Sequence, residues 1–166
     1  MSTIEETIQE NRAAVEELAA AAERCGATWT TPRAPGKWSP TQVVEHVAMA
    51  LEESARAVKG EPTKFPRFPS LVHPVLRSLF LKRVLRRGRF SSARTNKAMD
   101  PLTGPGTPAQ GRARLQAAMD AYAQACTERS RTSAMFTSTI FGPVSLVDYG
   151  RFQALHTLHH RRQLPA

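Results

Sequence analysis

Apolar side chains recur at three- and four-residue spacing in five stretches of the chain, and this period predicts helices. In the first stretch Ile4, Ile8 and Val15 fall on one side, while most acidic residues lie elsewhere. The predicted helices span residues 3–25, 39–59, 70–87, 107–131 and 145–164. The run from Met135 to Phe141 is rich in β-branched and aromatic residues, which favours a connector or a short strand leading into the last helix.

Capping residues mark the starts of the helices at 39–59 and 107–131. Ser39 and Thr107 each stand at an N-cap, Pro follows at the first helical position, and a Gln three residues after the cap completes a capping box. Trp38 precedes the first cap and is expected to pack on this helix as a hydrophobic staple. Gly142-Pro143, just before the last helix, are expected to end the element that precedes them.

Five helices and almost no strand predict an all-α fold. All but the helix at 70–87 have the lengths of a four-helix bundle, so that helix becomes an insertion, within about residues 62–106, between bundle helices two and three. At 166 residues the chain is expected to form one domain, 1–166. The apolar runs are too short for a membrane span, and the acidic N-terminus lacks a signal-peptide pattern, which predicts a cytoplasmic protein.

The net charge of +9 is concentrated in one segment. Residues 62–99 contain ten Lys or Arg and no Asp or Glu, whereas the rest of the chain is nearly balanced. We expect this segment to lie beside the mouth of the candidate site, with part of its charge facing an anionic substrate. The alternative is a binding module for nucleic acid or another anionic surface. Nucleic acid is disfavoured because aromatic residues for base stacking are few, with Phe80 and Phe90 the only ones next to the basic cluster at residues 82–89.

Histidines provide the candidate chemistry. His156 and His160 stand four residues apart on one face of the last predicted helix, and two imidazoles at this spacing can reach one metal ion. Thr157 stands where a zincin has its catalytic Glu, so the general base of that protease motif is missing. The alternative explanation of this histidine-rich stretch is a solvated basic helix end.

A third ligand has to come from another helix. His46 lies on the apolar stripe of the helix at 39–59, where a lone histidine is more typical of a core residue bonded to a carbonyl group. Beside an H-x-x-x-H helix in the same small bundle, His46 is the candidate third ligand. His73, next to Pro74, is expected at a surface loop or helix start, away from the site.

Two motifs resemble those of the DinB/YfiT-like superfamily of metalloenzymes. Lys37-Trp38-Ser39 followed by His46 is similar to the K-W-S-x-x-x-x-x-x-H element of the family's second helix. Residues 156–163 are similar to the H-x-x-H-H-R-x-Q element of its fourth helix, although Arg162 stands where many members have Gly. The stretch at 79–90 resembles one subgroup whose function is unassigned.

The resemblance implies a metal triad of His46, His156 and His160 in an antiparallel bundle of the up-down-down-up type, often a homodimer. Some members of the superfamily are thiol-dependent S-transferases that use low-molecular-weight thiols such as bacillithiol or mycothiol. Others are known only as stress- or damage-inducible proteins.

Three neutral imidazoles suit a divalent zinc, nickel or iron ion. The expected function is therefore a metal-dependent enzyme acting on a small molecule, either a thiol-dependent S-transferase or a hydrolase, with a purely structural metal as the alternative. No catalytic base is identified. Glu45 is next to His46 in the sequence, but its side chain points about 100° away from that of His46 around the helix. Four residues are expected to support the ligands or line the pocket: Trp38, Tyr149, His159 and Gln163.

Overall fold

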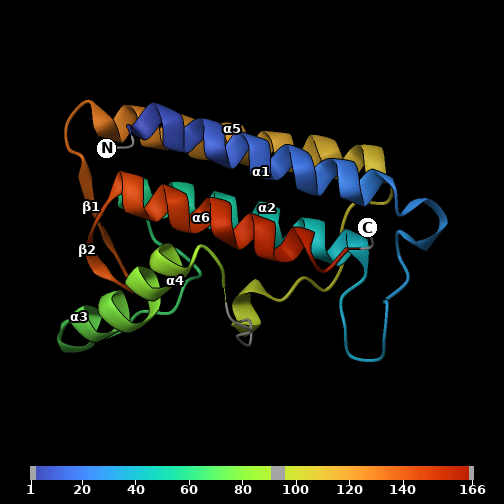
Figure 1. Ribbon diagram of the computed structural model, residues 1–166, viewed down its shortest axis with the longest axis horizontal. Coiled ribbons are helices and arrows are strands. Elements are labelled where there is room, and N and C mark those ends of the chain that lie inside the picture. Colours follow the sequence, from blue (N-terminus) through green and yellow to red (C-terminus); the bar gives the residue numbers. More distant parts are fainter. Residues whose placement is uncertain (1–2, 91–95, 165–166) are drawn as a thin grey trace.

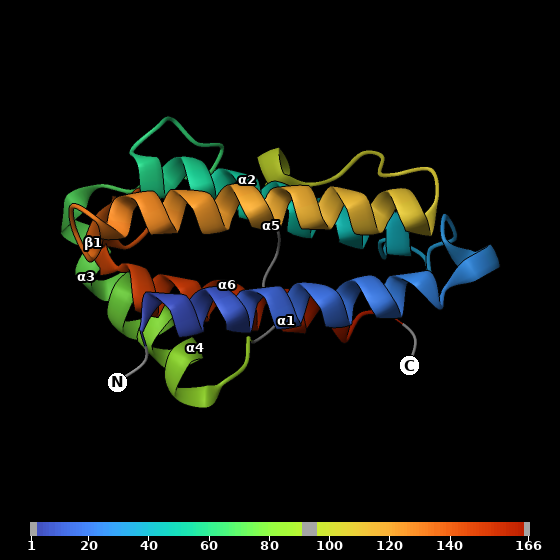
Figure 2. The same ribbon diagram turned by 90° about the horizontal axis from the view of Figure 1, so that it is seen from above.

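Four long helices lie side by side along the long axis of the molecule (Figures 1 and 2). The computed structural model describes residues 3–90 and 96–164. The long helices are α1 (Ile4–Glu23), α2 (Pro40–Lys59), α5 (Pro108–Ser130) and α6 (Leu146–Arg161). Helix α2 packs on α5, α5 on α1, and α1 on α6. The described part of the chain is mostly helical with one two-stranded sheet, in agreement with the expected all-α fold.

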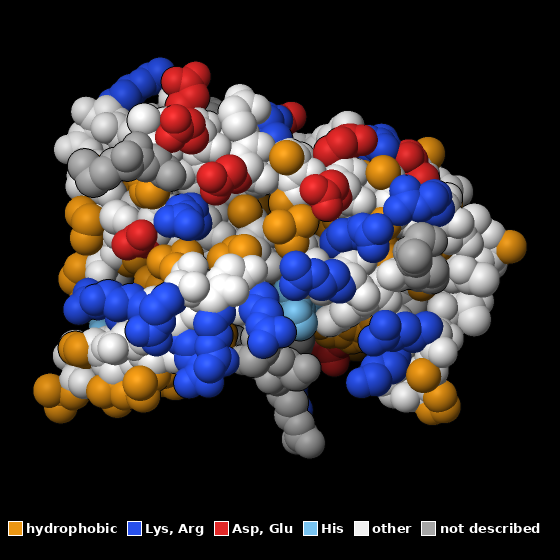
Figure 3. Space-filling view, in the orientation of Figure 1, with side chains coloured by type: hydrophobic (Ala, Val, Ile, Leu, Met, Phe, Trp, Pro, Cys, Tyr) orange, Lys and Arg blue, Asp and Glu red, His pale blue; other side chains and the backbone are white. Residues whose placement is uncertain are grey.

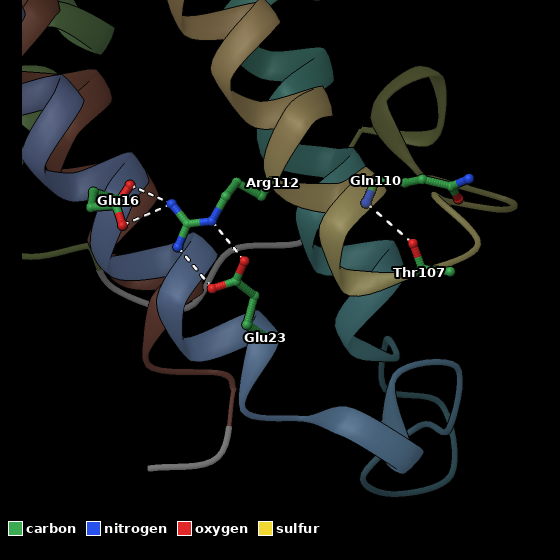
Figure 4. A network of polar contacts seen from close by, with 5 residues as sticks. All are labelled: Glu16, Glu23, Thr107, Gln110 and Arg112. Atoms are coloured by element: carbon green, nitrogen blue, oxygen red, sulfur yellow. Dashed lines mark hydrogen bonds and ion pairs between the residues drawn. The ribbon is translucent and has the colours of Figure 1, made fainter.

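The predicted caps start these helices. Ser39 forms the full capping box with Gln42, whose side chain lies 3.0 Å from the Ser39 backbone N–H. Thr107 forms only half of its box: its hydroxyl accepts a hydrogen bond from the Gln110 backbone N–H, but the Gln110 side chain points away from it (Figure 4). Helix α6 begins at the predicted Ser145 cap.

Ion pairs and one close approach hold α1 against its neighbours. Arg112 of α5 binds both Glu16 and Glu23 of α1, with N–O distances of 2.6 and 2.7 Å (Figure 4). On the other side, Gly150 of α6 lies so close to α1 that the Asn11 amide donates to its carbonyl oxygen at 2.8 Å. A larger residue than Gly would collide there with the Thr7 methyl group, so the spacing of α1 and α6 depends on Gly150.

The basic segment forms a helical insertion with an irregular centre. It consists of η2 (Ser70–Val72), α3 (His73–Leu76), the π-helical turn η3 (Arg77–Leu81) and α4 (Lys82–Arg87). Sequence periodicity predicted one regular helix at 70–87, and the π turn is the difference. Because a π turn contains more residues than an α turn, it changes the direction in which the side chains beyond it point. Two further single turns are η1 (Gly26–Thr28) and η4 (Lys97–Met99).

A hairpin joins α5 to α6. Strand β1 (Met135–Ser138) pairs antiparallel with β2 (Gly142–Ser145), and Phe136 lies opposite Val144. A connector or a short strand was expected at residues 135–141, and β1 is the second of these; β2 was not expected, because Gly142-Pro143 indicated a break. Gly142 has a φ of 68°, which allows the chain to turn into β2.

His73 packs closely on this turn. A Cβ on Gly142 would lie 2.8 Å from His73 Nδ1. Of the two positions expected for His73, a surface loop or a helix start, the second is found, since His73 is the first residue of α3. Its side chain is half-buried.

The core lies between the four long helices and is closed at one end by the hairpin. Its largest fully buried side chains include Leu18, Leu51, Leu115, Met119 and Tyr122. None of the helices within residues 3–90 and 96–164 has the length and apolar character needed to cross a membrane.

Candidate metal centre

Three histidines from two helices converge on one point. His46 comes from α2, and His156 and His160 come from α6. The Nε2 atom of His156 lies 3.4 Å from His46 Nε2 and 3.1 Å from His160 Nε2. The three ligand atoms all lie within 4.8 Å of one another, so these side chains could hold a metal ion.

Hydrogen bonds on the far side of two rings fix which nitrogen faces the centre. His46 Nδ1 donates to the carbonyl oxygen of Met99 at 2.8 Å, and His160 Nδ1 donates to Gln163 Oε1 at 3.0 Å. With the proton on Nδ1, the Nε2 atom of each ring carries a free lone pair that points to His156. Such outer hydrogen bonds are typical of metal-binding histidines.

The spacing of the nitrogens fits a small divalent ion. Zn–N bonds of about 2.0–2.1 Å in tetrahedral geometry put neighbouring nitrogens about 3.3–3.4 Å apart, close to the two separations observed. A proton on His156 Nε2 could satisfy only one of the two facing lone pairs at a time. A cation bound by all three nitrogens satisfies every lone pair, so the arrangement suits a metal better than a hydrogen-bonded cluster.

Burial keeps the cluster uncharged. Loss of water lowers the pKa of His46, lowers that of His156 well below 6.5, and lowers the pKa of His160 to about 3. The rings also disfavour protonation of one another, because each would place a positive charge beside the next. The neutral imidazole is the form that binds a metal, so all three ligands are ready at neutral pH.

The cluster lies at the wall of a cavity of about 570 Å³. All four residues expected to support the ligands or line the pocket are found along it: Trp38, Tyr149, His159 and Gln163. Trp38 packs against the core cluster and also lies beside two of the ligand rings. Its ring lies 4.7 Å from the His46 ring and 5.9 Å from that of His160, and its indole N–H donates to Asp100.

Aromatic side chains from three parts of the chain form the apolar wall of the cavity. Phe80 and Phe90 come from the insertion, Phe141 from the hairpin and Phe152 from α6. Phe80 contacts the other three, with ring centroids 5.7–6.1 Å apart. Phe90 also reaches the His156 ring at 5.5 Å. This wall could not be identified from the sequence, because its members are far apart in the chain.

The cations of the cavity are not those that were expected. The segment 62–99 does lie beside the site, but the described residues that it contributes to the lining are aromatic, apolar or amide side chains rather than Lys or Arg. Arg33 and Lys37, from the loop between η1 and α2, supply the positive charge instead. The sequence singles out Lys37 only as part of the K-W-S motif and gives no signal for Arg33.

No carboxylate is among the described residues that line the cavity. Glu45 is paired with Arg114 of α5 at 3.1 Å, so it faces away from the histidines, as its position on the helix indicated. His159 is the remaining candidate for proton transfer. Burial lowers its pKa below 6.5, and its Nε2 atom lies 3.4 Å from the amide nitrogen of Gln163.

Comparison with known proteins agrees with the motifs. The family model that describes the DinB superfamily matches residues 3–164, almost the whole chain. Neither the curated proteins nor the solved structures include a match. Since the family match covers both histidine-bearing helices and the segments between them, the chain belongs to the DinB superfamily.

Proposed function

We propose that this protein is a metal-dependent enzyme that joins a low-molecular-weight thiol to an electrophilic small molecule. The observation that carries the proposal is the convergence of His46, His156 and His160, through their Nε2 atoms, at the wall of an aromatic cavity. Three neutral imidazoles suit zinc, nickel or iron and leave coordination positions open for a substrate. Hydrolysis of a small molecule, with water in place of the thiol, is the related alternative.

The chain's own groups have separate roles in this proposal. His46, His156 and His160 hold the ion, which when bound acts as a Lewis acid that favours the deprotonated form of a thiol or water. Met99 and Gln163 orient two of the ligands. Burial lowers the pKa of His159, so its ring is neutral at neutral pH, and we assign it the role of accepting the thiol proton in place of the hydrogen bond from the Gln163 amide. The sulfur then bonds to the electrophilic carbon, and the leaving group departs with the electron pair of the broken bond.

The cavity indicates the kind of substrate. Phe80, Phe90 and Phe152 offer an apolar wall next to His156, which suits an aromatic or aliphatic body. Arg33 and Lys37 line the same cavity and are exposed, so they favour a carboxylate or another anionic group at its mouth. We propose an apolar electrophile, with the anionic group on the electrophile or on the thiol.

The arrangement of the helices supports the finer description of the fold. Figure 1 shows α1 and α6 running in one direction and α2 and α5 in the other. We propose that they form the up-down-down-up four-helix bundle, with residues 1–166 as one domain and about residues 62–106 as the insertion. A homodimer and a cytoplasmic location also belong to this proposal.

Metal analysis tests the site. Protein purified without a chelator or a histidine tag should contain one equivalent of divalent metal after dialysis, measured by mass spectrometry of the elements. His46→Ala and His156→Ala should each lose it, because two imidazoles remain. His73→Ala should keep it, since His73 packs against the hairpin. Metal retained in both triad variants would count decisively against the assignment.

A thiol-transfer assay separates catalysis from a structural metal. The metal-loaded protein is mixed with mycothiol, bacillithiol or glutathione and the electrophile monobromobimane, and the fluorescent thioether is measured. His159→Gln keeps the three ligands, so it should retain the metal and lose most of the rate. If the metal-loaded wild type reacts no faster than the metal-free variants with any of the three thiols, S-transfer is refuted and the structural alternative gains.

A further inference from the structure

A row of exposed apolar side chains marks the insertion. Within the described residues, seven large hydrophobic side chains are exposed, and five of them fall between residues 68 and 79. Leu71 is 88% exposed, Val75 54% and Leu79 67%, and these three, here called the apolar row, follow one another along η2, α3 and η3. The other two are Phe68 and Val72. Monomeric proteins seldom expose such a group of side chains without a binding partner.

Basic side chains adjoin this apolar row. Lys82, Arg83, Arg86 and Arg87 are exposed on α4, which continues the same helical segment. Figure 3 shows hydrophobic side chains gathered at the lower left, where Figure 1 has α3, with Lys and Arg side chains next to them. Because residues 62–99 contain no Asp or Glu, nothing in the segment offsets this charge. Any partner that binds over the apolar row must therefore tolerate or attract many positive charges.

We propose that the apolar row and the adjoining basic residues dock onto an anionic lipid surface. Leu71, Val75 and Leu79 would enter the boundary between headgroups and acyl chains, while the side chains of α4 meet the headgroup phosphates. A helix with exposed apolar residues on one side and Lys or Arg beside them has the composition of interfacial helices that lie on membranes. Each basic side chain near such a surface adds to the attraction.

Two other occupants fit the surface less well. A second copy docked on the same face through two-fold symmetry would bring two uncompensated basic segments together, and like charges oppose that contact. Nucleic acid would leave the apolar row unused. The aromatic residues that could stack on bases are also committed elsewhere, since Phe80 and Phe90 pack on each other and on Phe152 in the cavity wall.

Vesicle sedimentation of the full chain tests the proposal. The wild type should bind vesicles of phosphatidylcholine and phosphatidylglycerol, and should bind vesicles of phosphatidylcholine alone at least about tenfold more weakly. The triple variant Leu71→Ser, Val75→Ser, Leu79→Ser should bind the anionic vesicles at least about tenfold more weakly than the wild type. Leu102→Ser is the matched control, because Leu102 is 90% exposed but lies outside the segment, and it should bind as the wild type does.

Each contrary result has a distinct meaning. Absence of binding to anionic vesicles overturns the proposal. Binding that the triple variant keeps unchanged also overturns it, because charge alone would then explain the attraction. A dimer detected by light scattering and lost in the triple variant would assign the row to a second copy. A shift of duplex DNA that competes with vesicles would assign the basic residues to nucleic acid. Circular dichroism and metal content of the variants show that the exposed substitutions leave the fold intact.

Discussion

Acid should destabilise the metal-free protein at a pH at which most carboxylates are still ionised, because buried histidines resist protonation. In the folded chain, burial lowers the pKa of His156 well below 6.5 and lowers that of His160 to about 3. The unfolded chain takes up protons as the pH falls through about 6.5, and the folded chain does not. The free energy of unfolding therefore decreases below that pH, whereas these groups have no effect above it.

The size of the loss follows from these pKa values. Each histidine whose folded pKa lies well below 5 should remove about 2 kcal/mol between pH 7 and pH 5, because the loss is about 1.4 kcal/mol per pH unit below 6.5. His160 alone accounts for about 2 kcal/mol, and His156 and His46, whose pKa values are also lowered, add to this loss. A typical domain has only about 5–15 kcal/mol of stability in total.

Urea unfolding of chelator-treated protein, followed by circular dichroism at pH 7, 6 and 5, measures this loss. His160→Gln removes one of the titrating rings, so the loss between pH 7 and pH 5 should shrink by about 2 kcal/mol. Arg151→Gln, an exposed change on the same helix, should keep the full loss. A loss below about 1 kcal/mol in the wild type, or one that His160→Gln leaves unchanged, would refute the assigned burial of these rings.

Three further predictions follow from the same structure. Gln163→Leu should weaken Zn²⁺ binding by roughly 10–100-fold in competition with a zinc chelator, because it removes the acceptor for His160 Nδ1–H; unchanged affinity would contradict that role. Gly150→Ala should lower the free energy of unfolding by about 1–3 kcal/mol, and adding Thr7→Ser, which removes the colliding methyl group, should restore most of it. Cys126 is buried and burial raises its pKa to about 11, so a thiol reagent should label it only as the protein unfolds.

The histidine cluster could be predicted because local signals determine where its members point. Four-residue spacing puts His156 and His160 on one face of a helix, and the Ser39 cap sets the phase of α2 so that His46 falls on its buried side. Periodicity does not say which helices are neighbours, because packing partners depend on contacts between distant residues. The resemblance to a known family supplied that step.

The rest of the cavity could not be predicted from local signals. Arg33 and Lys37 stand in a loop whose Pro and Gly residues indicate turns but not the direction of the side chains. The orientation of Phe80 depends on the π turn, and no Pro or Gly at residues 77–81 marks that turn. Gly142 predicts a break as readily as a hairpin turn, because glycine can either end a segment or turn the chain.

The π turn at Arg77–Leu81 gives this segment a place where the number of residues can change. A π turn uses about one residue more than an α turn, so removing one residue there would restore regular α-helical spacing and leave Lys82–Arg87 facing as they do now. In the four long helices, a deletion of one residue would rotate everything beyond it by about 100° and would turn core residues toward water. Arg77–Leu81 is therefore a point at which related chains can differ in length by one residue without redirecting the charged face or rebuilding the metal centre.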